Sequence, residues 1–120
     1  MNSAETGRAG EEAAAAYLRE AGYEIRALNW RHGRYELDIV ASKDATLHIV
    51  EVKTRRRGSL TTPEEAITPQ KFRALRRAAA CYVAAAGEEI DVQFDLAAVE
   101  MEPDGTARVR LVEQAMECHW

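Results

Sequence analysis

The sequence predicts one α/β domain, residues 1–120, in which a mixed β-sheet is flanked by helices. Three observations support this prediction. The chain has 120 residues and is 47% hydrophobic, so it is near the modal domain size and can bury a core. Period-two strand patterns occupy residues 34–41 and 46–54, and helical patterns precede and follow them. Residues 1–3 and 113–120 are expected to be flexible ends.

Capping residues and turn residues place the remaining elements. Ser3 can cap a first helix that ends near Gly22, and Thr68 with Pro69 can start a second helix that ends at Gly87. The second helix would cross from the third strand to the fourth, which makes those two strands parallel. The other strands are expected at residues 23–30, 90–99 and 106–112.

The second and third predicted strands are separated by a short polar segment, so they most simply form a hairpin. If Asp44 and Ala45 are its two turn residues, Asp38 lies directly opposite Glu51. Side chains in that relation are about 4.5–5.5 Å apart at Cβ, and two carboxylates at that distance repel each other. Mg²⁺ or Mn²⁺ would turn this repulsion into binding, because both cations prefer oxygen ligands. The pattern therefore predicts a metal site at Asp38 and Glu51.

The same register places Glu36 opposite Lys53, on the face of the hairpin that carries the two carboxylates. A lysine there would lie within reach of a reacting group at the metal. A structural alternative stays open. In it, Glu36 and Lys53 form a cross-strand ion pair, and Asp38 and Glu51 are a partly hydrated pair at a sheet edge.

Basic residues are concentrated in one segment, although the whole chain is acidic with a net charge of −4. Residues 53–77 contain eight basic and two acidic residues, a local balance of +6, so the rest of the chain carries −10. Such a segment can bind a phosphate backbone, although a solvated helix face and a charged loop are the alternative. The candidate phosphate-binding residues are Arg55, Arg56, Arg57, Lys71, Arg73, Arg76 and Arg77.

Several motifs, in this order, resemble the YraN family of small bacterial proteins. They are Gly10-Glu11-Glu12-Ala13-Ala14, Asn29-Trp30-Arg31, Glu36-Leu37-Asp38-Ile39-Val40-Ala41, Val50-Glu51-Val52-Lys53-Thr54-Arg55 and Phe94-Asp95. That family is similar to the PD-(D/E)XK nuclease superfamily, and especially to archaeal-type Holliday-junction resolvases. The resemblance implies a restriction-endonuclease-like αβββαβ core.

The resemblance also implies a function, a metal-dependent endonuclease that hydrolyses phosphodiester bonds in structured or branched DNA. Asp38 and Glu51 would hold Mg²⁺ or Mn²⁺, Lys53 would act on the transition state, and Glu36 would be an additional or outer ligand. A non-catalytic nucleic-acid-binding module with the same fold is the alternative. Cleavage of a junction would favour a symmetric homodimer. A weaker third interpretation is an interaction protein whose tail, residues 115–120, docks a partner.

Glu11 shares the buried stripe of the first predicted helix with Ala14, Leu18 and Ala21. In the nucleases that the chain resembles, an acidic residue on the first helix helps to complete the metal site, which implies that role for Glu11. The alternative is a solvated carboxylate that the helix dipole stabilises.

The sequence supports no membrane-bound or zinc-binding class. Its apolar stretches are too short for a membrane span, and the N-terminus lacks the layout of a signal peptide. Cys81 and Cys118 are too few and too far apart for a disulfide framework or a four-ligand zinc site. His48 is expected to pack or form a hydrogen bond on a strand face. A cytoplasmic protein with no membrane partner is therefore expected.

Overall fold

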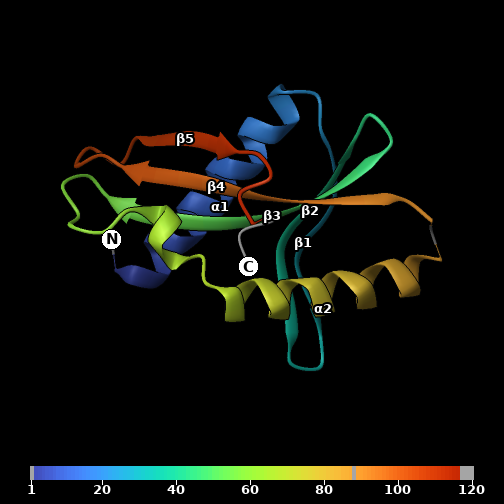
Figure 1. The fold of residues 1–120 in the computed structure, drawn as a ribbon. Coiled ribbons are helices and arrows are strands. Elements are labelled where there is room, and N and C mark those ends of the chain that lie inside the picture. The colour runs from blue at the N-terminus through green and yellow to red at the C-terminus, as the bar shows by residue number, and fades with distance from the viewer. Residues whose placement is uncertain (1, 88, 117–120) are drawn as a thin grey trace.

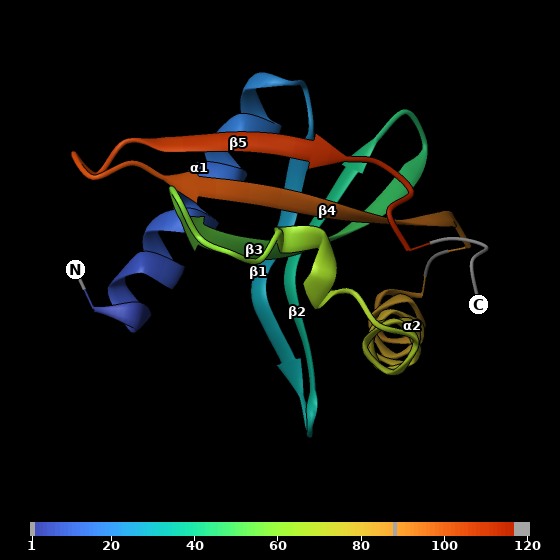
Figure 2. The same ribbon diagram turned by 60° about the vertical axis from the view of Figure 1, so that its left-hand side comes forward.

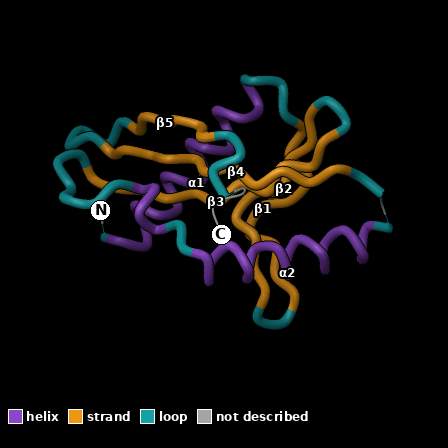
Figure 3. Tube along the Cα trace, viewed as in Figure 1, coloured by secondary structure: helices purple, strands orange, loops and turns teal. Residues whose placement is uncertain are grey.

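The computed structural model describes residues 2–87 and 89–116 as a five-stranded sheet with one long helix on each face (Figure 1). The helices are α1 (Ser3–Glu20) and α2 (Pro69–Ala86), and the short 3₁₀ helix η1 (Pro63–Ala66) interrupts the loop before α2 (Figure 3). The strands are β1 (Glu24–His32), β2 (Tyr35–Lys43), β3 (Thr46–Arg56), β4 (Asp91–Met101) and β5 (Ala107–Val112). The predicted α/β class is confirmed.

The strands lie in the order β1-β2-β3-β4-β5. Three of the four neighbouring pairs are antiparallel, and β3 and β4 are parallel as predicted. The helix α2 is the crossover that parallel neighbours require. The arrangement is compatible with the expected restriction-endonuclease-like core.

Local capping chemistry sets the helix ends. Asn2, rather than the predicted Ser3, caps α1: its side chain accepts a hydrogen bond from the Glu5 N–H at 2.9 Å, and the Glu5 side chain accepts from the Asn2 N–H. Thr68 caps α2, and Gly87 ends it at φ +68°, both as predicted.

Two hydrophobic cores lie on opposite faces of the sheet. Figure 2 shows α1 on one side and α2 on the other, beside the β1–β2 hairpin. The first core joins α1 to β2, β3 and β4 through side chains that include Ala14, Leu18, Ile39, Val50, Ala97 and Val99. The second joins α2 to β2 and β3 and includes Leu37, Val40, Leu47, Ile49, Leu75, Ala79 and Met116.

The β2–β3 hairpin has the predicted register. Pairing begins at Lys43 with Thr46 and continues to Ile39 with Val50. Asp44 and Ala45 form the turn with φ angles of 51° and 62°, the left-handed values that a two-residue type I′ turn needs. Turn chemistry and alternating burial therefore agree on one register, which places Asp38 and Glu51 just beyond the last pair.

In the described part of the chain, no helix is both long and apolar enough to cross a membrane. The expected flexible ends and docking tail fall in part on residue 1 and residues 117–120, which lie outside the described residues. Met116 is described and fully buried against the α2 side of the sheet.

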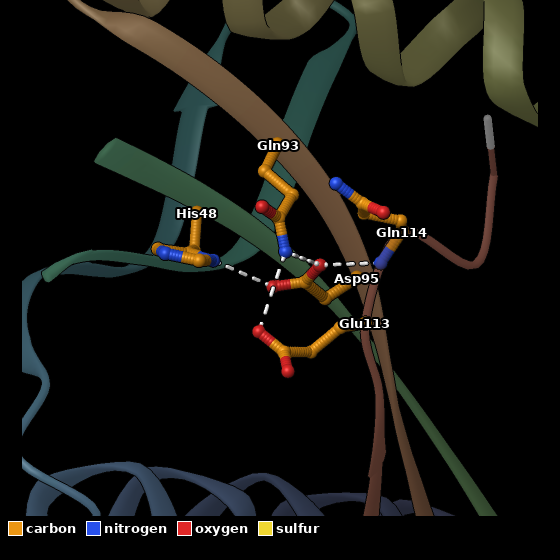
Figure 4. Close-up of polar contacts among 5 residues, drawn as sticks. All are labelled: His48, Gln93, Asp95, Glu113 and Gln114. Carbon is orange, nitrogen blue, oxygen red and sulfur yellow. Dashed lines mark hydrogen bonds and ion pairs between the residues drawn. The ribbon is translucent and has the colours of Figure 1, made fainter. Parts of the chain in front are cut away.

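A buried carboxylate ties three segments of the chain together. Asp95 on β4 is inaccessible to solvent and accepts three hydrogen bonds: from His48 Nδ1 on β3 at 2.7 Å, from Gln93 Nε2 at 2.9 Å and from the Gln114 N–H at 2.9 Å (Figure 4). The Gln114 bond anchors the turn that follows β5, just before Met116. The expectation that His48 forms a hydrogen bond on a strand face is confirmed, whereas the central role of Asp95 was not predicted.

We expect Asp95→Ala to lower the free energy of unfolding by roughly 3 kcal/mol or more, because three donors lose their acceptor and each unsatisfied buried group costs about 1–3 kcal/mol. Gln93→Ala is the control, since it removes one donor and leaves the other two bonds in place. Urea denaturation measures both. Equal losses in the two variants would contradict a central role for the Asp95 carboxylate.

Candidate metal and nucleic-acid site

The strands β2 and β3 separate immediately beyond the Ile39–Val50 pair, while β2 stays paired with β1 as far as Tyr35. Side-chain directions change at the same place. Ile39 faces the α1 core, but Leu37, which strict alternation would put on the same face, packs into the α2 core. The outer part of the β1–β2 hairpin therefore extends away from β3 as an arm. Asp38 lies at the fork where β2 and β3 separate.

Asp38 replaces the missing strand partner at this fork. Its Oδ2 accepts a hydrogen bond from the Val52 N–H at 2.9 Å. In the hairpin register, Val52 would otherwise be opposite Leu37, whose backbone has moved away. Because a buried N–H without an acceptor is costly, the carboxylate stabilises the end of the β2–β3 pairing. The bond also fixes the direction of the Asp38 side chain.

Glu51 lies next to Asp38 with only 14% of its side chain exposed. Burial, a hydrogen bond with Asp38 and the charge of Asp38 together raise the pKa of Glu51 to about 8, while Lys71 acts in the opposite direction. Glu51 therefore holds a proton at neutral pH, and its hydrogen bond with Asp38 joins the two carboxyl groups. The expected juxtaposition of Asp38 and Glu51 is present in the structure.

Two lysines lie beside the carboxylate pair. Lys71 in the first turn of α2 places its Nζ 3.5 Å from Glu51 Oε2. Lys53 follows Glu51 by two residues on β3, so the two side chains point to the same face of the strand. Among the described residues, Lys53 has no carboxylate within ion-pair distance.

The predicted pairing of Glu36 with Lys53 is wrong. Glu36 lies on the arm, beyond the fork, and its Oε2 forms an ion pair with Arg31 Nη2 on β1 at 3.4 Å. The register arithmetic would hold only if the β2–β3 ladder continued past Ile39. Since the strands separate there, Glu36 moves away from β3 and Lys53 keeps its ammonium group available.

The helix α1 brings Glu11 to the same site. Burial raises the pKa of Glu11, and the charges of Asp38 and Glu36 raise it further, so its carboxylate lies near both. A close approach positions the helix: a Cβ at Gly10 would overlap the Thr54 side chain on β3. Ala21, which was expected on the buried stripe with Glu11, is instead the exposed C-cap residue.

An open pocket of about 960 Å³ connects these groups. It lies at the fork between α1, β2, β3 and the first turn of α2. The predicted residues that line it are Glu11, Glu36, Asp38, Glu51, Lys53, Arg55, Arg56, Arg57 and Lys71. The structure therefore gathers the acidic residues and the first half of the basic segment around one depression.

The other predicted basic residues, Arg73, Arg76 and Arg77, are exposed on α2 and do not line this pocket. The guanidinium of Arg76 lies over the Phe72 ring, 5.6 Å from its centre. Arginines at the pocket also have contacts within the protein. Arg55 Nε donates to Thr61 Oγ1 at 3.2 Å, and Arg57 pairs with Glu102 at 3.0 Å.

Sequence reasoning missed the polar wall that α1 contributes to the pocket, formed by Ser3, Thr6 and Gly7. A signal was present, because Ser3, Gly7 and Glu11 recur every four residues and so lie on one helix face. The Gly58-Ser59 segment also lines the pocket.

The donor set suits a hard divalent cation. Asp38 and Glu51 supply two carboxylates, and in the described residues no group of three or more His, Cys, Asp or Glu side chains is arranged around a metal position. The Val52 N–H points toward β2, so its carbonyl oxygen faces the same edge of the strand. Mg²⁺ usually takes one or two carboxylates and completes its shell with water and phosphate oxygens, so these residues fit it.

Comparison with known proteins places this site within a family. Residues 10–99 match the family described as "Uncharacterised protein family UPF0102". The chain belongs to the UPF0102 family. A UPF0102 protein of Porphyromonas gingivalis is 47% identical over 102 residues, covering 85% of this chain and 76% of that protein. One of Bacteroides thetaiotaomicron is 46% identical over 111 residues (92% and 91%), and one of Symbiobacterium thermophilum is 45% identical over 114 residues (94% and 97%).

The UPF0102 match covers the whole acidic part of the site, from Glu11 to Glu51, and continues through the basic segment to Val99, near the end of β4. The resemblance to the YraN family, inferred from the motifs, is confirmed. The family match ends before β5.

The raised pKa of Glu51 predicts a pH-dependent stability. The folded protein holds a proton on Glu51 up to about pH 8, whereas the unfolded chain loses it near the ordinary glutamate pKa, about 4.3. The stabilisation is complete below that lower value and is lost as the pH rises through the folded pKa. In metal-free buffer, wild type should lose up to about 1.4 kcal/mol per pH unit in this window relative to Glu51→Gln.

Urea denaturation at several pH values measures this difference. Glu100→Gln is the matched control, because it removes an exposed carboxylate on β4 and leaves Glu51 in place, so the loss of stability that comes from Glu51 should remain. If wild type and Glu51→Gln have parallel pH profiles, Glu51 does not hold the proton.

Proposed function

We propose that this UPF0102 protein is a metal-dependent nuclease that hydrolyses phosphodiester bonds in structured or branched DNA. One observation carries the proposal: the fork between β2 and β3 brings Asp38 and Glu51 together, with Lys53 on the same wall of the pocket. Asp38 stabilises the end of the β2–β3 pairing, but that role does not require a second carboxylate beside it, so the pair favours a chemical role.

Each side chain has a distinct role in this proposal. Asp38 and Glu51 hold Mg²⁺ or Mn²⁺, which when bound supplies Lewis-acid stabilisation of the charge on the phosphate. Lys53 orients the attacking water and stabilises negative charge in the transition state. Lys71, 3.5 Å from Glu51, favours the ionised form of that carboxylate. Glu11 acts as an outer acidic partner.

The basic rim of the pocket binds the DNA backbone in this proposal. Arg55, Arg56 and Arg57 line the pocket directly after Lys53. Their contacts give affinity without reading base sequence, which fits a substrate recognised by its shape. We propose the cytoplasm as the compartment and a symmetric homodimer as the form that would present two sites to a junction.

A non-catalytic nucleic-acid-binding module is the second candidate. Its support is the carboxylate pair itself, which provides two acidic ligands and has a raised pKa at Glu51, so that a proton competes with a cation. Metal binding separates the two candidates, because only the nuclease needs the cation.

We expect Mn²⁺ to bind wild type with an affinity that rises as the pH approaches 8, because binding must displace the proton from Glu51. Asp38→Asn should abolish the binding, since it removes one of the two anionic ligands. Isothermal titration calorimetry measures the affinity. Asp44→Asn is the matched control, because Asp44 is an exposed residue in the hairpin turn.

The fold of Asp38→Asn should persist, because an asparagine oxygen can still accept the Val52 hydrogen bond. Circular dichroism checks this point. Unchanged Mn²⁺ affinity in Asp38→Asn would contradict the assignment of the metal site, and an absence of Mn²⁺ binding to wild type would favour the non-catalytic module.

Lys53→Met should lower the rate of DNA cleavage by roughly 10²–10³ while metal and DNA binding change little, because the lysine acts mainly in the transition state. Lys53→Arg should also cleave poorly, since a planar guanidinium keeps the charge but directs its donors differently. Cleavage of a branched DNA in Mg²⁺ measures both variants. Full activity of Lys53→Met would exclude the lysine from the mechanism.

A further inference from the structure

The strand β5 carries two arginines on the face of the sheet that holds Glu51 and Lys53. Cross-strand pairing shows this directly. Lys53 on β3 pairs with Ala98 on β4, and Ala98 pairs with Arg110 on β5. Residues paired across a sheet point to the same face, so these three form one row. Two strand spacings separate the ends of the row, about 10 Å.

A second row runs parallel to the first. Arg55 pairs with Glu100, and Glu100 pairs with Arg108. Along each strand the two rows are two residues apart, about 6.6 Å. Each row therefore begins with a basic residue on β3 and ends with an arginine on β5. The first row has only the small Ala98 side chain in the middle.

The rows enclose a pocket of about 450 Å³. Four arginines line it, Arg55, Arg56, Arg108 and Arg110, together with two carboxylates, Glu64 and Glu100. The loop that carries η1 forms its outer wall. The pocket at the fork is also lined by Arg55, Arg56, Gly58 and Ser59, so the two depressions adjoin each other. The basic rim of the candidate site thus extends across β4 to β5.

Each of the two β5 arginines is accessible and forms an ion pair with a carboxylate. Arg110 Nη2 lies 2.9 Å from Glu64 Oε2, and Arg108 Nε lies 3.2 Å from Glu102 Oε1, with 60% and 75% of the two arginine side chains exposed. Glu64 is exposed as well, so the Arg110 pair contributes about 1 kcal/mol or less, whereas only 11% of the Glu102 side chain is exposed. A guanidinium has five N–H donors, so one carboxylate contact leaves others for a phosphate.

We infer that Arg108 and Arg110 bind backbone phosphates that flank the scissile bond, so that the nucleic acid crosses the sheet from the fork over β4 to β5. This inference rests on the proposed function and adds the direction of the substrate path. It uses two side chains that lie outside the basic segment 53–77. The arginines on α2 line neither pocket, so they lie off this path.

Binding of a fluorescent DNA duplex, measured by anisotropy in EDTA over a series of salt concentrations, tests the inference. Arg108→Ser with Arg110→Ser should lower the slope of log affinity against log salt by about two and weaken binding at least about tenfold near physiological salt. Arg19→Ser with Arg26→Ser is the matched control, because it removes the same charge from residues that line neither pocket. Mn²⁺ affinity should be unchanged in both double variants.

A variant that binds DNA more tightly provides a second test, because a loss of folding could not produce tighter binding. Glu100 lies between Arg55 and Arg108, so Glu100→Gln should tighten DNA binding severalfold. If wild type binds DNA and neither the β5 variant nor Glu100→Gln differs from the control, the path over β5 is wrong while the proposed function stands. If wild type binds no DNA even at low salt, both are wrong.

Discussion

The hydrogen bond from the Val52 N–H to the Asp38 carboxylate is the interaction on which the arrangement of the site depends. A strand that leaves its neighbour exposes a backbone donor, and this side chain satisfies it. The carboxylate that ends the pairing is thereby fixed beside Glu51, in a place with little solvent to screen the two charges. The hydrogen bond that satisfies the Val52 N–H thus holds one carboxylate next to another, and a proton or a cation is needed to offset their repulsion.

Much of the fold could be predicted because its signals are local. The turn residues Asp44 and Ala45, the alternating burial of the hairpin and the caps at Thr68 and Gly87 each act within a few residues. The juxtaposition of Asp38 with Glu51 follows from the same register. Local patterns were sufficient wherever the strands stayed paired.

The failures arise where tertiary contacts override the local pattern. Glu36 was expected opposite Lys53, but Leu37 packs against α2 and draws the end of β2 away from β3. No periodicity in the hairpin contains that information, because it is set by a helix that begins 32 residues later. Asp95 was missed for a related reason, since its donors come from β3, from β4 and from the segment after β5.

The basic residues show the same contrast between what the local sequence predicts and what tertiary structure decides. The sequence identifies one basic segment, yet its residues separate in space: the part next to Lys53 lines the pocket, and the part on α2 faces solvent elsewhere. The sheet then adds Arg108 and Arg110, which are far away in sequence. The clustering of basic residues in the sequence therefore indicates roughly where the site lies. The order of the strands decides which arginines lie on the same face of the sheet as the site.

The contact between Gly10 and Thr54 links the two faces of the sheet mechanically. Thr54 adjoins Lys53, and successive residues of a strand point to opposite faces. The α1 backbone thus presses on the back of the strand segment whose front carries the lysine. Any side chain at position 10 would displace β3 or tilt α1. The substitution would therefore change the pocket without contacting it directly. Whether a substitution at Gly10 is tolerated consequently depends on the position of Lys53 on the opposite face of the sheet, as well as on the packing around α1.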